Sequence, residues 1–325
     1  MRRRQFLTLL IAAAATTSAR AQPSPRDHVR IGFLWGGIAE VLATRVNAFL
    51  EGLRSTIRPE GVAVQLLSRT ADGDPGRLPA LAREIASGNL DVFFAAGPAA
   101  LHAARTVAPQ IPTVAIDLET NPVEAGYVSS LAHPGGNLTG IFFDFPDFAT
   151  KWLELLREAL PNISSVAALW DSSTGTMQLN AIHAAARHMG LQVQVIEIRE
   201  AASVGAAMRD ARSRAVDGVL LLSSPLVGSN VGKIAELLLR ERLPAITLFP
   251  EFAHAGGLLA YGPNLIDLFR QAGAMAGKVV MGSSPADLPV ERPSRFQLVV
   301  NLNTARQLQL SMSPSLLIRA DEVIE

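Results

Sequence analysis

Cysteine is absent from the 325-residue chain, which excludes disulfides, thiolate catalysis, cysteine-based zinc sites and iron–sulfur clusters. Net charge is absent too, because 29 basic residues balance 29 acidic ones, so no excess of positive charge points to nucleic-acid binding. No apolar run reaches the roughly 20 residues that a membrane-spanning helix needs. The remaining composition, 49% hydrophobic and 18% charged, is typical of a globular protein, and the length allows roughly two domains.

Motifs of common enzymes are missing as well. The sequence contains no G-x-S-x-G and no H-E-x-x-H, and Trp35–Ile38 stands where a dinucleotide-binding G-x-G-x-x-G would follow the first predicted strand. Gly228–Ile234 differs from a phosphate-binding loop in spacing, and Ile234 replaces the metal-binding Ser or Thr. His183 and His188 are five residues apart and do not share a helix face. We therefore predict no catalytic residue, no metal site and no cofactor.

The first 21 residues have the pattern of an export signal. A basic start, Arg2–Arg4, precedes the apolar run Phe6–Ala15 and the small-x-small site Ala19–Ala21, so we expect cleavage near Ala21. Arg3–Leu7 is typical of a twin-arginine signal, with an ordinary secretory signal as the alternative. Residues 22–28 form a linker, and without cysteine no lipid anchor of the lipoprotein type is possible. The expected location is the periplasm.

Short apolar runs alternate with helical patterns in two blocks, residues 29–120 and 150–250, separated by an irregular stretch from Asp117 to Pro146. Alternation of this kind is typical of parallel sheets flanked by helices, and strands that are apolar throughout are expected where both faces are covered. We therefore predict an α/β fold of two Rossmann-like lobes.

Segments after the second block suggest that the chain crosses between the lobes several times. We expect an N-terminal lobe at 29–141, a C-terminal lobe at 142–255, a return segment to the N-terminal lobe at 256–292, and a C-terminal segment at 293–325 that packs on the C-terminal lobe or the hinge. A hinge of several crossings lets two lobes open and close without sliding past each other.

A ligand site is expected where the parallel strands end, because open α/β sheets bind ligands outside the carboxyl ends of their strands. Backbone N–H groups in the loops at Gly36 and Gly97 would suit an anion, and the set as a whole would suit a small zwitterion or a polar molecule with an apolar part. Trp35 could instead be core, and Asp171 and Ser172 could instead be helix N-caps. The candidate ligand-binding residues are Trp35, Gly36, Gly97, Pro98, Ala99, Asp117, Glu119, Asn121, Asp171, Ser172, Ser173, Ser223, Ser224, Glu251 and Tyr261.

Several stretches give the chain a resemblance to the periplasmic substrate-binding proteins of ABC importers, whose characterised relatives include tryptophan/tyrosine-type binders. The resemblance implies the type I periplasmic binding protein fold, with a ligand in the cleft between two lobes. It covers essentially the whole chain after the signal. The matching stretches are Ile31–Gly37, Arg77–Ala82, Ala95–Ala100, Ser130–Gly140, Gly256–Asn264, Ala286–Glu291, Val300–Ala305 and Arg319–Ile324.

The sequence departs from the family pattern at two expected ligand loops. Asn121-Pro122 stands where the family often has Asp-Pro, and Trp170–Ser172 reads Trp-Asp-Ser where the family commonly has Trp-Asn-Pro. Additional carboxylates in the cleft change the ligand charge that is preferred, so the resemblance is not extended to an aromatic amino acid as the ligand.

The resemblance implies a soluble receptor that captures a small organic, amino-acid-like molecule and delivers it to an ABC permease with a cytoplasmic ATPase. We expect a monomer that touches the membrane only through a membrane protein and binds no nucleic acid. A receptor of the same fold that feeds a membrane sensor is the alternative, and an enzyme on a two-lobed α/β scaffold is a more remote one. A sugar-repressor-like regulator is disfavoured by the export signal and by the lack of a helix-turn-helix before residue 29.

Overall fold

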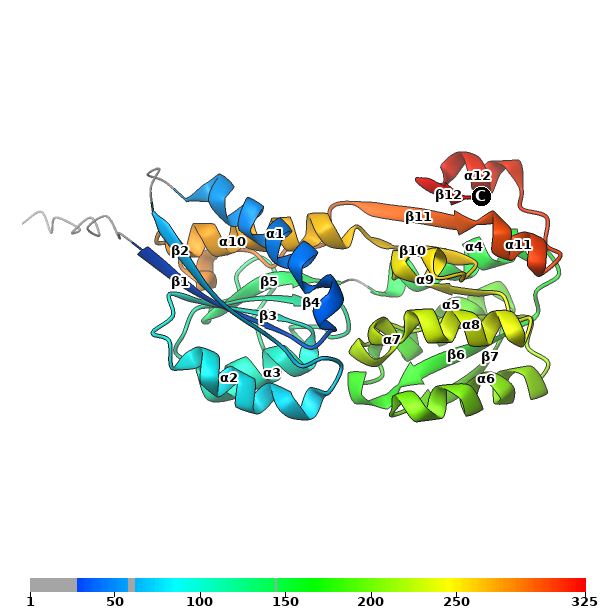
Figure 1. Cartoon of the computed structure of the whole chain (residues 1–325), viewed down its shortest axis with the longest axis horizontal. Coiled ribbons are helices and arrows are strands. Elements are labelled where there is room, and N and C mark those ends of the chain that lie inside the picture. Colours follow the sequence, from blue (N-terminus) through cyan, green and yellow to red (C-terminus); the bar gives the residue numbers. More distant parts are fainter. Residues whose placement is uncertain (1–27, 58–61, 144) are drawn as a thin grey trace, which may run out of the picture.

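The computed structural model describes residues 28–57, 62–143 and 145–325, and the predicted signal peptide lies outside these ranges. Two α/β lobes lie side by side (Figure 1). The first contains a five-stranded sheet in the order β2-β1-β3-β4-β5, and all its strand pairs are parallel. Its strands are β1 (His28–Trp35), β2 (Ala63–Thr70), β3 (Val92–Ala96), β4 (Thr113–Asp117) and β5 (Leu138–Phe142).

Helices cover both faces of this sheet. Its flanking helices are α1 (Ala39–Thr56), α2 (Leu78–Ala86), α3 (Pro98–Val107) and α10 (Leu265–Val280), with 3-10 turns at Pro75–Arg77 and Pro285–Asp287. Strands β3, β4 and β5 are buried along their whole length, as expected for strands covered on both faces.

The second lobe contains a seven-stranded sheet in the order β12-β11-β10-β9-β8-β6-β7, in which only the β10–β11 pair is antiparallel. Its strands are β6 (Ser165–Asp171), β7 (Gln192–Ile198), β8 (Gly218–Leu221), β9 (Ala245–Thr247), β10 (Leu259–Pro263), β11 (Phe296–Asn301) and β12 (Glu322–Ile324).

Its helices alternate with these strands. They are α4 (Phe145–Ala159), α5 (Met177–Met189), α6 (Val204–Ser213), α7 (Pro225–Ser229), α8 (Val231–Arg240), α9 (Pro250–His254), α11 (Leu302–Gln307) and α12 (Pro314–Arg319), with 3-10 turns at Ser172–Thr174 and Ala201–Ser203. The prediction of two α/β lobes with parallel sheets flanked by helices is confirmed.

Three crossings connect the lobes: β5 to α4, β10 to α10, and the segment after α10 to β11. The predicted boundary at residue 256 is wrong for one strand, because β10 pairs with β9 and β11 in the second sheet. Gly256, with φ +99°, turns the chain from α9 into β10 within one lobe. The return to the first lobe begins at α10, which lies against α1 in Figure 1.

The predicted irregular stretch from Asp117 to Pro146 contains one strand that the sequence pattern did not indicate. Strand β5 is short and carries Gly140 at its centre, which weakens its apolar pattern. A Cβ atom at this position would lie 2.1 Å from Ala115 O, so only glycine lets β5 approach β4. This strand completes the first sheet and starts the first crossing.

Candidate functional site

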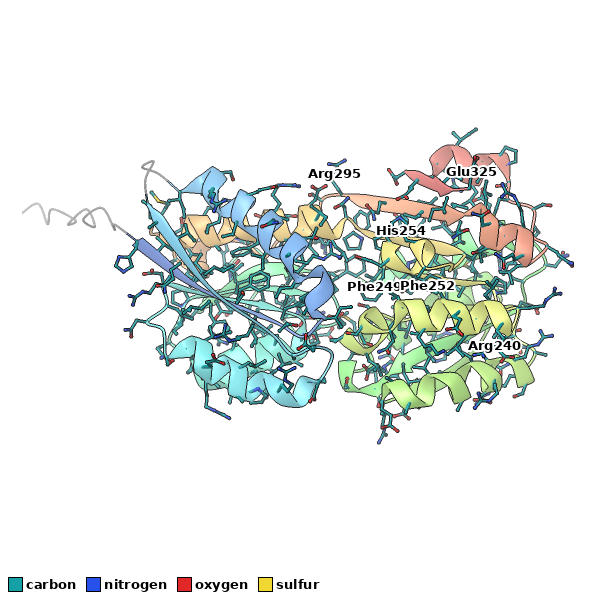
Figure 2. The ribbon with its side chains drawn as sticks, in the orientation of Figure 1. Arg240, Phe249, Phe252, His254, Arg295 and Glu325 are labelled. Atoms are coloured by element: carbon teal, nitrogen blue, oxygen red, sulfur yellow. The ribbon has the colours of Figure 1, made fainter. Side chains whose placement is uncertain are left out.

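A cavity of about 190 Å³ lies between the lobes, where the carboxyl ends of β1, β3 and β4 face the ends of β8 and β9. This is the edge at which open α/β sheets bind ligands. Phe249, labelled in Figure 2, lies at the junction of the lobes. The wall consists of Trp35, Gly36, Gly37, Ile38, Arg45, Ala96, Gly97, Ile116, Leu118, Glu119, Ser223, Ser224, Pro225, Gly228, Ser229, Val231, Phe249, Glu251, Leu265, Leu268 and Phe269.

Seven of the fifteen predicted site residues line this cavity, and eight do not. The structure brings together Trp35, Gly36, Gly97, Glu119, Ser223, Ser224 and Glu251. It leaves outside the wall Pro98, Ala99, Asp117, Asn121, Asp171, Ser172, Ser173 and Tyr261.

Trp35 ends β1 and forms an aromatic wall of the cavity. It is half-buried, and its ring meets the ring of Phe269 edge-on, with centroids 6.4 Å apart. A Cβ atom on Gly37 would lie 2.2 Å from Trp35 Cζ2, so glycine at this position makes room for the indole. Trp35 also packs against the core, so the two alternatives for this residue, core and cavity wall, are both observed.

Two residues at the predicted anion site at the start of α3 offer no free N–H group. Gly97 lines the cavity with φ +91°, but its N–H donates to Ile116 O at 2.7 Å. Pro98 follows at the first helical position and has no N–H to offer. An anion in this cavity therefore receives no hydrogen bond from the backbone of Gly97 or Pro98, whereas the backbone of Gly36 and Gly37 also lines the wall.

Two neighbouring carboxylates follow β4, and both are buried. Asp117 Oδ1 accepts from the N–H groups of Glu119 (2.9 Å) and Thr120 (3.1 Å), which closes a tight turn. Glu119 extends into the cavity, where Ser223 Oγ of the other lobe donates to its Oε1 at 2.6 Å. This hydrogen bond connects the lobes directly.

Burial controls the charge of this pair. It raises the pKa of Asp117 to about 6 and, together with the nearby charge of Asp117, it raises the pKa of Glu119 to about 8. Two adjacent buried carboxylates cannot easily both ionise, so Glu119 carries its proton at neutral pH. The cavity therefore contains a neutral carboxyl group at this position.

Ser223 and Ser224 have different roles. The backbone of Ser223 is held by Gln178 of α5, whose Oε1 accepts from Ser223 N and whose Nε2 donates to Ser223 O, both at 2.7 Å. Ser224 Oγ accepts from Val227 N at 3.0 Å and caps α7. Only the Ser223 hydroxyl reaches across to the other lobe.

Arg45 of α1 is a charged residue of the cavity wall that the strand-end argument missed. It is only 6% exposed, and its guanidinium forms an ion pair with Glu251 of α9 in the other lobe. The guanidinium carbon lies 5.9 Å from the ring centroid of Phe269. One feature of the sequence could have indicated this residue: Arg45 interrupts the apolar face of α1, three residues after Leu42 and four before Phe49.

Asp171 and the residues after it form a self-contained turn. Asp171 Oδ1 accepts from Ser173 N (3.0 Å) and Ser173 Oγ (2.7 Å), and Trp170 Nε1 donates to Gly175 O at 2.8 Å. Asp171 is thus the N-cap of the 3-10 turn Ser172–Thr174, which is the alternative noted for it above.

Asn121 and Tyr261 line separate hollows. Asn121 Oδ1 accepts from Val123 N at 3.1 Å, and its side chain borders a hollow beside Met177 of α5. Tyr261 stacks on Phe148 and Phe296 near the crossings, with centroids 5.3 and 6.0 Å apart. Asn121 follows a strand and Tyr261 lies in one, but neither residue lines the shared cavity.

Within the described ranges, no three His, Cys, Asp or Glu side chains gather closely enough to hold a metal ion. None of the helices in residues 28–57, 62–143 and 145–325 is long and apolar enough to cross a membrane.

Two α/β lobes joined by three crossings around a shared cavity form the type I periplasmic binding protein fold. The sequence profile of the family described as ABC transporter substrate binding protein matches residues 40–324. The chain belongs to this family, as the sequence resemblance suggested.

Similar proteins agree with this assignment. A tyrosine-binding protein of Clostridioides difficile is 24% identical over 268 residues, which are 81% of this chain and 76% of that protein. The structure of an ABC domain from Streptococcus pneumonia in complex with L-Trp superimposes with a TM-score of 0.83 at 22% identity, over 91% of this chain and 100% of the other. A conserved domain protein of Vibrio cholerae also gives 0.83, at 21% identity over 91% and 99% of the two chains.

Proposed function

We propose that the chain is the solute-binding component of an ABC importer, which captures an amino-acid-like molecule between its lobes and delivers it to a membrane permease. The shared cavity carries the proposal, because both lobes supply polar groups to it and already contact each other across it. A ligand that contacts both lobes favours the closed form, since only that form satisfies all the contacts at once. A permease can then recognise the closed shape.

The cavity chemistry supports an amino-acid-like ligand. Trp35, Phe249 and Phe269 supply apolar surface, and Arg45 and Glu251 supply one charge of each sign. The names of similar proteins point the same way, because one is a tyrosine-binding protein and another was solved in complex with L-Trp. A volume of about 190 Å³ suits a small molecule and not a polymer.

The remaining parts of the proposal follow from the export pattern and the family. We propose that residues 1–21 direct the chain to the periplasm and that a permease with a cytoplasmic ATPase is its partner. The protein then acts as a monomer that binds and releases its ligand unchanged, without making or breaking a bond. Neighbouring genes for a permease and an ATPase would support transport over the sensor alternative.

A thermal-shift screen with amino acids, small amides and aromatic acids tests the proposal. A ligand at a hundredfold excess over its Kd stabilises the folded chain by about 2.7 kcal/mol, because it binds the folded form and not the unfolded one. For a chain of 325 residues that corresponds to a rise in Tm of about 4 °C. A flat response across the library would refute capture of such a molecule, and turnover of a hit would contradict the non-catalytic role.

A further inference from the structure

The cavity contains one cation, and that cation is already paired. Among the described residues of the wall, Arg45 is the only one with a cationic side chain, and Glu251 of the opposite lobe neutralises it. The pair therefore connects α1 of the first lobe to α9 of the second. A buried guanidinium is costly to leave without a partner, so a ligand that displaces Glu251 must bring an anion of its own.

Two buried acceptors in the same wall have no partner among the described residues. They are Glu251 Oε2, the carboxylate oxygen that does not contact Arg45, and Ser229 Oγ at the end of α7. Buried polar atoms in folded proteins nearly always have a hydrogen-bond partner, and leaving one without costs stability. Both atoms belong to the second lobe; Glu251 Oε2 needs a donor, and the Ser229 hydroxyl can accept a hydrogen bond or donate one.

A zwitterion satisfies all these groups at once. Its carboxylate can replace Glu251 on the guanidinium, and its ammonium can take the released Glu251 together with Ser229. A ligand with only a carboxylate would leave Glu251 without a counter-ion and its buried Oε2 without a donor. A ligand with only an ammonium would add a second positive charge beside Arg45.

We propose that the Arg45–Glu251 ion pair is exchangeable: the ligand carboxylate binds Arg45 of the first lobe, and the ligand ammonium binds Glu251 and Ser229 of the second. This inference rests on the proposed function and specifies the ligand class as a molecule with both groups. The ion pair connects the lobes in a closed form without ligand, and the ligand takes over this connection when it binds. Arg45 and Glu251 are then the residues that determine charge specificity.

A cycle of variants and ligand analogues tests the exchange. The twenty standard L-amino acids are first tested against the full chain, and the best binder is compared with its carboxamide and its des-amino acid. For L-tyrosine these are tyrosinamide and 3-(4-hydroxyphenyl)propanoate. We expect each analogue to bind the unmodified chain about 10- to 100-fold more weakly, the range expected for one charge-assisted hydrogen bond.

The variants assign each charge to its partner. In Arg45→Met the amino acid and its carboxamide should bind within about threefold of each other, while the des-amino acid stays weaker. In Glu251→Gln the amino acid and the des-amino acid should converge instead. This non-additivity reports direct contact, because a residue with a merely structural role would weaken all three ligands by the same factor.

Arg69→Met is the matched control, since Arg69 forms an ion pair with Glu84 on the exposed surface of the first lobe. It should leave all three affinities unchanged. Equal weakening of all three ligands in Arg45→Met, or an unchanged preference for the carboxylate, would overturn the exchange while leaving capture intact. If the chain binds an uncharged molecule and none of the twenty amino acids, the exchange is also overturned while capture stays intact. If Arg45→Met does not fold, Arg45→Lys takes its place, because this variant keeps the positive charge beside Glu251.

Discussion

Ligand affinity is expected to fall as the pH rises from about 5 to about 8, by up to about tenfold per pH unit. The reason is the Glu119 carboxyl, which closure buries between the lobes and joins to Ser223. We expect an open form in which Ser223 has moved away with the second lobe and Glu119 faces solvent. The pKa of the carboxyl then falls towards its ordinary value, so closure requires it to take up a proton.

The direction follows from the two pKa values. The pKa of Glu119 is about 8 in the closed form, against an ordinary value of 4.5. The contribution of Glu119 to the stability of the closed form is therefore fully present below pH 4.5, and it is lost progressively as the pH rises towards 8. Between pH 5.5 and 7.5 the loss reaches up to about 100-fold in affinity. Asp117 contributes less to this linkage, because its hydrogen bonds come from its own loop and do not change on closure.

Calorimetry at several pH values measures this effect, with a ligand whose own groups do not titrate in the range. Uptake of up to one proton per ligand should appear as a dependence of the binding enthalpy on the buffer. Glu119→Gln keeps a neutral hydrogen-bonding group at this position, and its affinity should vary by no more than about threefold between pH 5.5 and 7.5. A flat profile in the unmodified chain, or a slope retained in Glu119→Gln, would show that Glu119 does not take up a proton on binding.

Substitution of Gly52 by alanine should lower the free energy of unfolding by about 3 kcal/mol or more. Helices α1 and α10 meet here with their backbones in contact: a Cβ atom on Gly52 would lie 1.8 Å from Arg270 O, and one on Gly273 would lie 1.9 Å from Phe49 O. No side chain can move aside, because the clash is with backbone atoms. Since α1 carries Arg45, the same change should also weaken binding.

Gly205→Ala is the matched control in urea denaturation. Gly205 lies in α6, and its Cβ would lie 3.7 Å from the Arg209 side chain, an ordinary contact distance. Alanine is a better helix former than glycine by about 1 kcal/mol, so this variant should be as stable as the unmodified chain or more so. Equal effects of the two substitutions would mean that α1 and α10 are not closely packed at Gly52.

The alternation of apolar runs and helical patterns was sufficient to predict the two lobes. The rule that ligands bind where parallel strands end brought Trp35, Glu119, Ser223 and Glu251 to one cavity. Both inferences use patterns of neighbouring residues, which can be recognised in a single sequence. The crossing at β10 was misplaced because Gly256-Gly257 marks a turn, and a turn does not show which sheet receives the next strand.

The residues that sequence reasoning misplaced depend on contacts between distant segments. Arg45 reaches the cavity only because α1 packs on α10, which lies more than 200 residues away in the sequence. Asp171 ends strand β6, where a ligand residue is expected, but its carboxylate accepts hydrogen bonds from its own turn. Position after a strand therefore indicates the neighbourhood of a site, whereas the direction of the side chain depends on the local hydrogen bonds.

Ligand-induced closure is most directly measured as an interlobe distance. The substitutions His102→Cys on α3 and Arg212→Cys on α6 introduce one labelling site in each lobe. Since the chain has no cysteine of its own, a thiol-reactive dye attaches at these two sites alone. Both side chains are exposed, and Figure 1 shows both helices on the edge of the lobes away from β11. Energy transfer should rise saturably with ligand, with a midpoint at the calorimetric Kd. Transfer that stays constant while ligand saturates the protein would contradict capture by closure of the two lobes.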